Sequence, residues 1–174
     1  NLVQNGDFSE EGVQEVSNGS FSQESSELVT NGDFATDSDW VKQTGWSISS
    51  GKASFSGGSD ANIIQSTALI TIGNTFKITV DVSDMDNGEL SVRLGGGAAT
   101  EIARIQSNGS YVFYGVAISS NITFRALSSF NGSIDNCSVR EVGQDWSLGT
   151  GWSIAEDKAI QDGTGSGSSL QQSN

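Results

Sequence analysis

Short apolar runs alternate with turn residues along most of this chain. From residue 28 onward they recur about every ten residues and are separated by Gly, Asn, Asp and Ser. The alternation is clearest in Phe76–Val82, where four apolar residues are interleaved with Lys77, Thr79 and Asp81. A period of two is typical of a strand with one buried and one exposed face. These runs therefore predict β-strands.

The pattern predicts ten short strands, at residues 28–31, 46–49, 52–56, 62–66, 75–84, 89–94, 101–106, 110–118, 122–128 and 133–141. Asn87-Gly88 and Asn108-Gly109 each separate two of these strands, and this dipeptide favours the positive φ angles of a tight hairpin turn. No segment has the apolar period and the caps of an α-helix. The spacing indicates an all-β fold, an antiparallel jelly-roll β-sandwich.

A stretch from the middle of the chain returns near its end. Residues 39–53 and 145–159 are identical at 9 of 15 positions, at an offset of 106 residues, which also places Ile64-Gln65 over Leu170-Gln171. Self-similarity over such a period indicates modules in tandem. We therefore predict a complete module at 28–142 and the incomplete start of a second copy at 143–174. Because the sequence begins at Asn1 and stops early in the second copy, we expect it to be part of a longer array.

Residues 1–27, which we call the leader, contain a shorter repeat. Asn5-Gly6-Asp7-Phe8 and Asn18-Gly19-Ser20-Phe21 precede Asn31-Gly32-Asp33-Phe34 at intervals of 13 residues. We call each copy an opening segment, because the third one begins the predicted module. Each copy follows an apolar pair or its remnant and has the pattern of a short strand, a turn and a Phe anchor. Two interpretations stay open: a slippage duplication that leaves a loosely ordered leader, or spare strands that pair with a neighbouring domain or chain.

The composition excludes several classes of function. The 174 residues include no His and one Cys, so the chain by itself has no Ser-His-Asp triad, no Cys-His pair, no His zinc site and no internal disulfide. Cys137 lies in an alternating strand and is expected to be a small buried residue. The net charge of −13 argues against binding to nucleic-acid phosphates. No apolar stretch approaches the ~20 residues of a membrane-spanning helix.

Two motifs carry a resemblance to a known family. The predicted module begins with Leu28-Val29-Thr30-Asn31-Gly32-Asp33-Phe34 and ends with Ile134-Asp135-Asn136-Cys137-Ser138-Val139, with Trp40 and Trp46 following the first motif. This resembles the jelly-roll carbohydrate-binding modules that open with Asn-Gly-(Asp/Gly)-Phe and close with Ile-Asp-Asn-(Val/Ile)-Ser-Val. It is similar too to the copies of that module in bacteriophage tail fibres, head fibres and other structural proteins. The resemblance covers roughly residues 28–142.

The resemblance implies carbohydrate binding and, in some members, a structural calcium between the first and last strands. Asp33 and Asp135 are the candidate oxygen ligands for that metal, although Ca²⁺ takes six to eight oxygens. The sugar-binding members often carry a Glu directly after the Phe, where this chain has Ala35. The alternative role for the two aspartates is to hydrogen-bond the two termini of the module.

Four side chains are the candidates for contact with carbohydrate: Trp40, Tyr114, Arg93 and Arg125. Trp rings stack on sugar rings, and Arg93, Arg104 and Arg125 come from three separate predicted strands. The alternative for the Trp residues is a place in the core, since the repeat retains them. The alternative for the three arginines is an electrostatically balanced outer face.

These features lead us to expect a non-catalytic structural or adhesive virion protein, a bacteriophage fibre or capsid-decoration component located on the virion or outside the cell. The expected partners are further copies of the chain, other virion proteins and a cell-surface glycan, with no nucleic acid and no membrane insertion. No cofactor is expected apart from the calcium. The alternative is a carbohydrate-binding module of an extracellular enzyme, or of a bacterial surface protein or filament.

Overall fold

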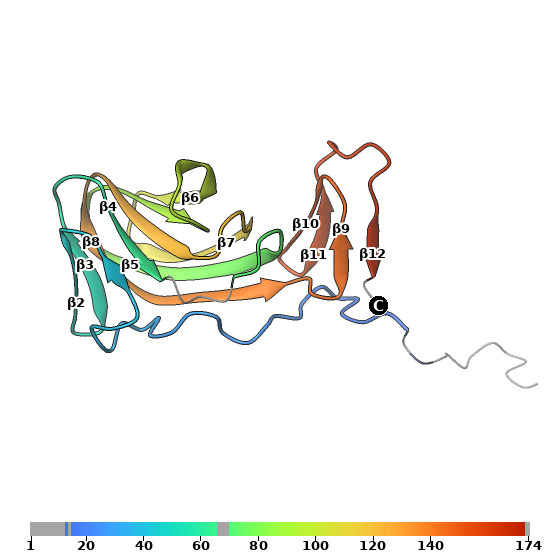
Figure 1. The fold of residues 1–174 in the computed structure, drawn as a ribbon, viewed down its shortest axis with the longest axis horizontal. Coiled ribbons are helices and arrows are strands. Elements are labelled where there is room, and N and C mark those ends of the chain that lie inside the picture. The colour runs from blue at the N-terminus through green and yellow to red at the C-terminus, as the bar shows by residue number, and fades with distance from the viewer. Residues whose placement is uncertain (1–12, 14, 66–69, 173–174) are drawn as a thin grey trace, which may run out of the picture.

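The chain folds as an antiparallel β-sandwich with a smaller all-β extension at its C-terminal end (Figure 1). A computed structural model describes residues 13, 15–65 and 70–172. The elements in chain order are β1 (Val41–Lys42), β2 (Trp46–Ser49), β3 (Lys52–Ser56), β4 (Ala61–Gln65), β5 (Thr75–Arg93), the 3₁₀ helix η1 (Ala98–Thr100), β6 (Glu101–Ile105), β7 (Gly109–Val116), β8 (Ile122–Val142), β9 (Trp146–Leu148), β10 (Trp152–Ala155), β11 (Lys158–Gln161) and β12 (Leu170–Gln172). The predicted all-β jelly-roll sandwich is confirmed. Within the described residues, no helix has the length and hydropathy needed to cross a membrane.

Two long strands, β5 and β8, organise the sandwich. They pair with each other from Thr75–Val142 to Arg93–Thr123. The other edge of β5 carries β7 along its first half and β6 along its second half. The other edge of β8 carries β4 and then β3, which lead on to β1 and β2. The curvature of these strands wraps the sheet around one hydrophobic core (Figure 1).

The middle of β5 bends where the sequence predicts a hairpin. The pattern predicts four strands at 75–84, 89–94, 122–128 and 133–141, whereas the structure joins each pair into one strand. The pairing of β5 with β8 shifts register around Asn87. Gly88 has a φ of 81°, and a Cβ at this position would lie 2.2 Å from the backbone nitrogen of Phe130. Asn87-Gly88 is therefore an irregularity within β5 that resembles a β-bulge. It makes no hairpin turn, because β8 pairs with β5 on both sides of it.

Two further local predictions differ from the structure. Asn108-Gly109 connects β6 to β7, and both strands pair with β5, so the dipeptide links two partners of one strand and makes no hairpin. Residues 28–31 are not a regular strand, yet the N–H of Leu28 donates to the carbonyl of Val139 at 3.1 Å. The beginning and the end of the predicted module therefore lie side by side, as expected.

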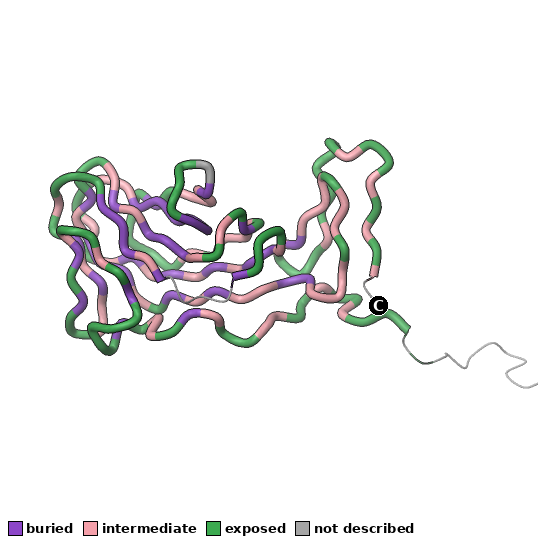
Figure 2. Tube along the Cα trace, viewed as in Figure 1, coloured by how far each residue is buried: buried purple, intermediate pink, exposed green. Residues whose placement is uncertain are grey.

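The core follows the predicted alternation. Phe76, Ile78, Val80 and Val82 are 0–3% exposed. The purple, buried positions gather in the sandwich and thin out in the extension (Figure 2). Cys137 is buried as predicted, and burial raises the pKa of its thiol, which suits a packing role.

The extension consists of two small sheets, β10 with β11 and β9 with β12. They stand beside the end of the sandwich at which β8 leaves it (Figure 1). The division into a leader, a module at 28–142 and a second copy from 143 stays a prediction. The first opening segment, Asn5-Gly6-Asp7-Phe8, lies outside the described residues.

Candidate functional site

The structure places Trp40 in the core. Its ring centroid lies 5.0 Å from that of Phe34 and 6.2 Å from that of Phe124, and its exposed fraction is 6%. Its Nε1 donates to the backbone oxygen of Asn31 at 3.0 Å. A ring covered in this way offers no open face to a sugar. The geometry therefore supports the core alternative for Trp40.

Arg93 and Arg125 lie with Arg104 on one face of the adjacent strands β5, β6 and β8. Ser91 of β5 is the register partner of Arg104 on one side and of Arg125 on the other. The structure thus brings together the three arginines that the sequence distributes over three strands.

Each of these arginines has an acidic partner. Arg93 is buried and its guanidinium lies 3.4 Å from a carboxylate oxygen of Glu101. Arg104 bonds to Glu101 and to Glu89 at 2.8 Å, and Arg125 lies 3.5 Å from Asp60. A hydrogen bond from Ser91, together with the two nearby arginines, lowers the pKa of Glu101. The charges therefore balance one another, as the alternative expects, although Arg93 is buried and does not lie on an outer face.

Tyr114 belongs to a different part of the sheet. It lies on β7 opposite Lys77 of β5 and is half-buried. Because β7 pairs with the first half of β5 and Arg93 ends the second half, Tyr114 does not share a site with the arginines.

The two aspartates each bind their own segment. Asp33 accepts a hydrogen bond from the N–H of Ala35 at 3.3 Å, and Asp135 accepts one from the N–H of Asn136 at 2.7 Å. Among the described residues there is no group of three or more His, Cys, Asp or Glu side chains that could hold a metal ion. The calcium that the resemblance implies stays a prediction.

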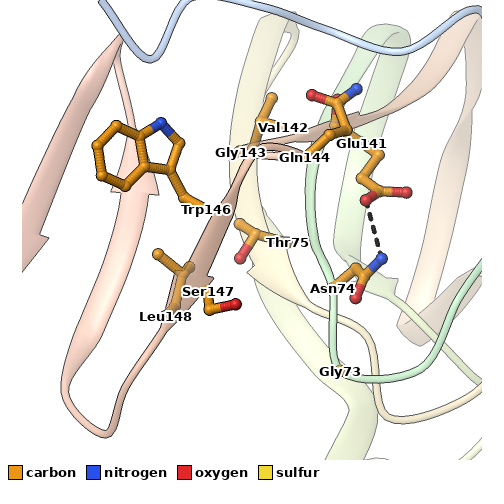
Figure 3. A pocket seen from close by; sticks show the side chains of 10 residues that line it. All are labelled: Gly73, Asn74, Thr75, Glu141, Val142, Gly143, Gln144, Trp146, Ser147 and Leu148. Atoms are coloured by element: carbon orange, nitrogen blue, oxygen red, sulfur yellow. Dashed lines mark hydrogen bonds between the residues drawn. The ribbon is translucent and has the colours of Figure 1, made fainter. Parts of the chain in front are cut away.

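A pocket of about 380 Å³ lies where the extension meets the sandwich (Figure 3). We call it the junction pocket. Its described lining residues come from the turn before β5, the end of β8 and the strand β9: Gly73, Asn74, Thr75, Glu141, Val142, Gly143, Gln144, Trp146, Ser147 and Leu148. The volume lies at the lower end of the range for small-ligand sites.

Two polar atoms of the lining residues are buried out of reach of the pocket and have no hydrogen-bond partner. They are Oγ1 of Thr75 and Oε1 of Gln144. Burying such a group without a partner typically costs about 1–3 kcal/mol. Because neither oxygen has accessible surface, a ligand in the pocket would find its polar partners in other lining groups.

The remaining groups give the junction pocket a polar and an apolar side. On one side Asn74 donates to a carboxylate oxygen of Glu141 at 2.8 Å. On the other side lie Leu148 and the base of Trp146 (Figure 3). The Trp146 ring leans toward the leader, where its centroid lies 5.0 Å from that of Phe21. The pocket therefore combines fixed polar groups with a small apolar wall.

Sequence reasoning does not single out the residues of this pocket apart from Trp146. In the alternating pattern of this strand Thr75 lies on the same face as Lys77 and Thr79, which predicts an outward-facing, solvated side chain. It is nevertheless only 4% exposed, because the segment after β8 covers it. No signal in the strand pattern reports this burial, since the cover comes from residues about seventy positions away.

No protein-family model matches this sequence, and no curated protein matches it. Among solved structures, the enzymatically active domain of tailspike protein 4 of bacteriophage CBA120 is 19% identical with a TM-score of 0.45, over 66% of this chain and 21% of that chain. A carbohydrate binding module of family 29 is 12% identical with a TM-score of 0.44, over 67% and 87%. An arabinose-bound α-L-arabinofuranosidase is 14% identical with a TM-score of 0.45, over 66% and 26%. At these identities and TM-scores the similarities carry no argument about ligand or activity.

Proposed function

We propose that this chain is a non-catalytic carbohydrate-binding protein and that the junction pocket holds its ligand. The observation that carries this proposal is a small pocket that combines the polar side chains of Asn74 and Glu141 with an apolar wall. Sugar hydroxyls both donate and accept hydrogen bonds, so one ligand can bond to the Asn74 amide and the Glu141 carboxylate together. The apolar wall of Leu148 and the base of Trp146 suits the C–H face of a sugar ring.

The biological setting we propose is a virion, with this chain as a structural or adhesive part of a bacteriophage fibre or capsid decoration. The support is the resemblance of the opening and closing motifs at residues 28–34 and 134–139. In that setting further copies of the chain and other virion proteins are the partners, and a cell-surface glycan is the ligand. Single modules then bind weakly, and display in many copies strengthens binding by avidity. The alternative is a carbohydrate-binding module of an extracellular enzyme or of a bacterial surface protein.

Glycan binding by the whole chain tests the proposal directly. A glycan panel identifies a ligand, and calorimetry compares the chain with its Asn74→Ala variant, which removes a polar side chain from the pocket wall. We expect the variant to bind at least about tenfold more weakly, which corresponds to about 1.4 kcal/mol. Asn121→Ala is the matched control, since Asn121 is half-buried directly before β8, as Asn74 is directly before β5, and does not line the pocket. Equal binding by both variants, or no glycan bound at all, contradicts the proposal.

Absence of hydrolysis is a separate expectation. Glycoside hydrolysis commonly uses two carboxyl groups about 5–10 Å apart, and among the described lining residues of the junction pocket Glu141 is the one acid. The chain also lacks His, the side chain that most often acts as a base near neutral pH. Incubation with the bound glycan should release no reducing sugar. Release that Glu141→Gln abolishes would overturn the non-catalytic assignment and leave the binding assignment intact.

A further inference from the structure

The extension repeats contacts of the sandwich residue by residue. In the sandwich, β2 pairs with β3 so that Trp46 lies opposite Phe55 and Ile48 opposite Ala53. In the extension, β10 pairs with β11 in the same way, with Trp152 opposite Gln161 and Ile154 opposite Ala159. The N–H of Gln43 donates to Asn62 at 3.0 Å, and the N–H of Gly149 donates to Ser169 at 3.0 Å. Nε1 of Trp46 donates to Ala61 at 3.1 Å, and Nε1 of Trp152 donates to Ser168 at 3.5 Å. The same local architecture is therefore built twice.

The opening segment of this second architecture comes from the leader. In the sandwich, Phe34 packs on Trp40 at 5.0 Å with an interplanar angle of 39°, and Trp40 donates to Asn31. In the extension, Phe21 packs on Trp146 at 5.0 Å with an angle of 40°, and Nε1 of Trp146 donates to the backbone oxygen of Asn18 at 3.1 Å. The second opening segment therefore makes the same contacts with Trp146 that the third one makes with Trp40.

The backbone of the two opening segments is also alike. Asn18 and Phe21 have φ angles of 46° and 56°, and Asn31 and Phe34 have 53° and 47°. In each copy the N–H of the Phe donates to the carbonyl of the Asn, at 3.0 Å and 3.2 Å respectively. The Asn side-chain oxygen then accepts from the N–H five residues on, at Gln23 and at Thr36. In both copies the turn formed by Asn-Gly-x-Phe places the aromatic ring against the Trp.

A glutamine completes each contact. Gln65 of β4 exchanges hydrogen bonds with the backbone of Thr30, just before the third opening segment. Gln172 of β12 donates to the backbone oxygen of Ser17 at 3.4 Å, just before the second. By these contacts Gln172 is the counterpart of Gln65, whereas the sequence offset of 106 residues assigns Gln171 to it. The structural alignment therefore differs from the sequence alignment by one residue here.

We propose that Trp146 and Gln172 form a docking site for an Asn-Gly-x-Phe segment, and that the opening segments are interchangeable ligands of such sites. The occupant here is Asn18–Phe21 of the same chain. The first opening segment has Asn5 and Phe8 at the positions of Asn18 and Phe21, and the contact at Ser17, which is Gln4 in this copy, is made by a backbone oxygen, so it is a ligand for the same kind of site. The leader is then a series of opening segments, and each of them completes one β-structure by packing its Phe against a Trp.

The exposure of the two sites makes exchange at Trp146 feasible. Trp40 and Phe34 are buried, because Phe124 of β8 covers the Trp40 ring at 6.2 Å. Trp146 and Phe21 are only half-buried, and within the described residues the one aromatic ring that packs on Trp146 is Phe21. A peptide can therefore reach the Trp146 ring once Phe21 has left it.

Amide hydrogen exchange on the full chain tests the docking. Phe21→Ala should speed exchange at residues 146–148 and 170–172 at least tenfold and leave the paired amides of β5 and β8 unchanged. Val13→Ala, at a position that is 82% exposed, is the control and should change neither region. Trp146→Ala combined with Phe21→Ala should add little to either change alone, since both remove the same contact. Equal exchange at 146–148 in the Phe21→Ala and Val13→Ala chains would overturn the proposal.

Peptides added in trans test interchangeability. A peptide of residues 15–26, added to the Phe21→Ala chain at high micromolar concentration, should restore protection at 146–148 and 170–172. A peptide of residues 1–13 should do the same, because it carries the first opening segment. The 15–26 peptide with Phe21→Ala should restore nothing. If neither native peptide restores protection, or if the substituted peptide restores it equally well, the site does not recognise the Phe and the proposal is wrong.

Discussion

At the scale of single residues, Glu27 joins the two ends of the sandwich. Its carboxylate accepts hydrogen bonds from the hydroxyl of Ser138 at 2.6 Å and from the N–H groups of Val139 and Val29 at 2.9 and 3.0 Å, with Arg140 at 3.3 Å. Burial alone would raise the pKa of this carboxyl, but these hydrogen bonds and the arginine outweigh it and lower the pKa. A single acid thus fastens the segment before the third opening segment to β8.

We expect Glu27→Gln to destabilise the chain at pH 7 by about 1–2 kcal/mol, since hydrogen bonds to charged groups contribute more than neutral ones. Because the folded-state pKa lies below the usual 4.5, the carboxylate stabilises the fold above that pH, and the contribution disappears as the pH falls through the folded value. Urea unfolding at pH 7 and near pH 3 measures the difference, which should shrink in acid. Glu156→Gln, at an exposed turn, is the control. A difference that stays constant with pH would contradict the role of the charge.

Val80 tests the alternation on which the fold prediction depends. It is 1% exposed, and Val80→Ala should lower the free energy of unfolding by about 1–3 kcal/mol through lost burial and a small cavity. Val112→Ala on the neighbouring strand β7 is the matched control, because Val112 is 54% exposed. Denaturant unfolding should separate the two variants clearly, and equal losses would show that the core lies elsewhere.

At the scale of elements, the long strands β5 and β8 replace the four short ones that the pattern predicts. Both bend where residues with positive φ gather: Asp84, Gly88, Ser128 and Ser129. Asn-Gly favours a tight turn in isolation, but here the strand keeps its partner through the bend. One pair of strands therefore belongs to both halves of the sandwich.

Gly88→Ala should disrupt this bend. A methyl group at Gly88 meets the Phe130 backbone at 2.2 Å, and backbone atoms of a paired strand cannot move aside cheaply. We expect a loss of at least about 2 kcal/mol, the sum of a left-handed backbone penalty and a clash. Gly57→Ala is a close control, with a φ of 83° against 81° and no atom within 4 Å of the added carbon. It should show the backbone penalty alone, and equal effects in thermal unfolding would refute the close approach.

At the scale of the whole molecule, acidic side chains far outnumber basic ones. The chain carries 21 acidic and 8 basic side chains, and several of the basic ones bind acids in place, as Lys77 binds Glu24 of the leader at 2.6 Å. That hydrogen bond raises the pKa of Lys77. The remaining acids give the surface a net negative charge at neutral pH, which keeps copies apart.

Solubility should therefore fall as the pH approaches the pI of about 4.1, where the repulsion between copies vanishes. Light scattering between pH 7 and pH 3.5 measures this, and added salt at pH 7 should have little effect by comparison. A chain that stays monodisperse at its pI would show that features other than net charge keep it apart.

Much of the fold can be predicted from the sequence, because strand period, turn residues and repeats are local properties. The alternation in Phe76–Val82 identifies the core face, and the bounds of β2 and β3 agree with the predicted ranges. The sequence also foresees that the arginines of three strands meet on one face, whereas in the junction pocket it singles out Trp146 alone among the described lining residues.

The rest is decided by contacts between distant residues. Trp40 is buried because Phe124 of β8 covers it, and Thr75 is buried because residues after β8 close over it. Asn87-Gly88 bends within a strand because a partner strand passes beside it. In each case the local pattern is compatible with two outcomes, and the packing of a segment far away in the chain selects one of them.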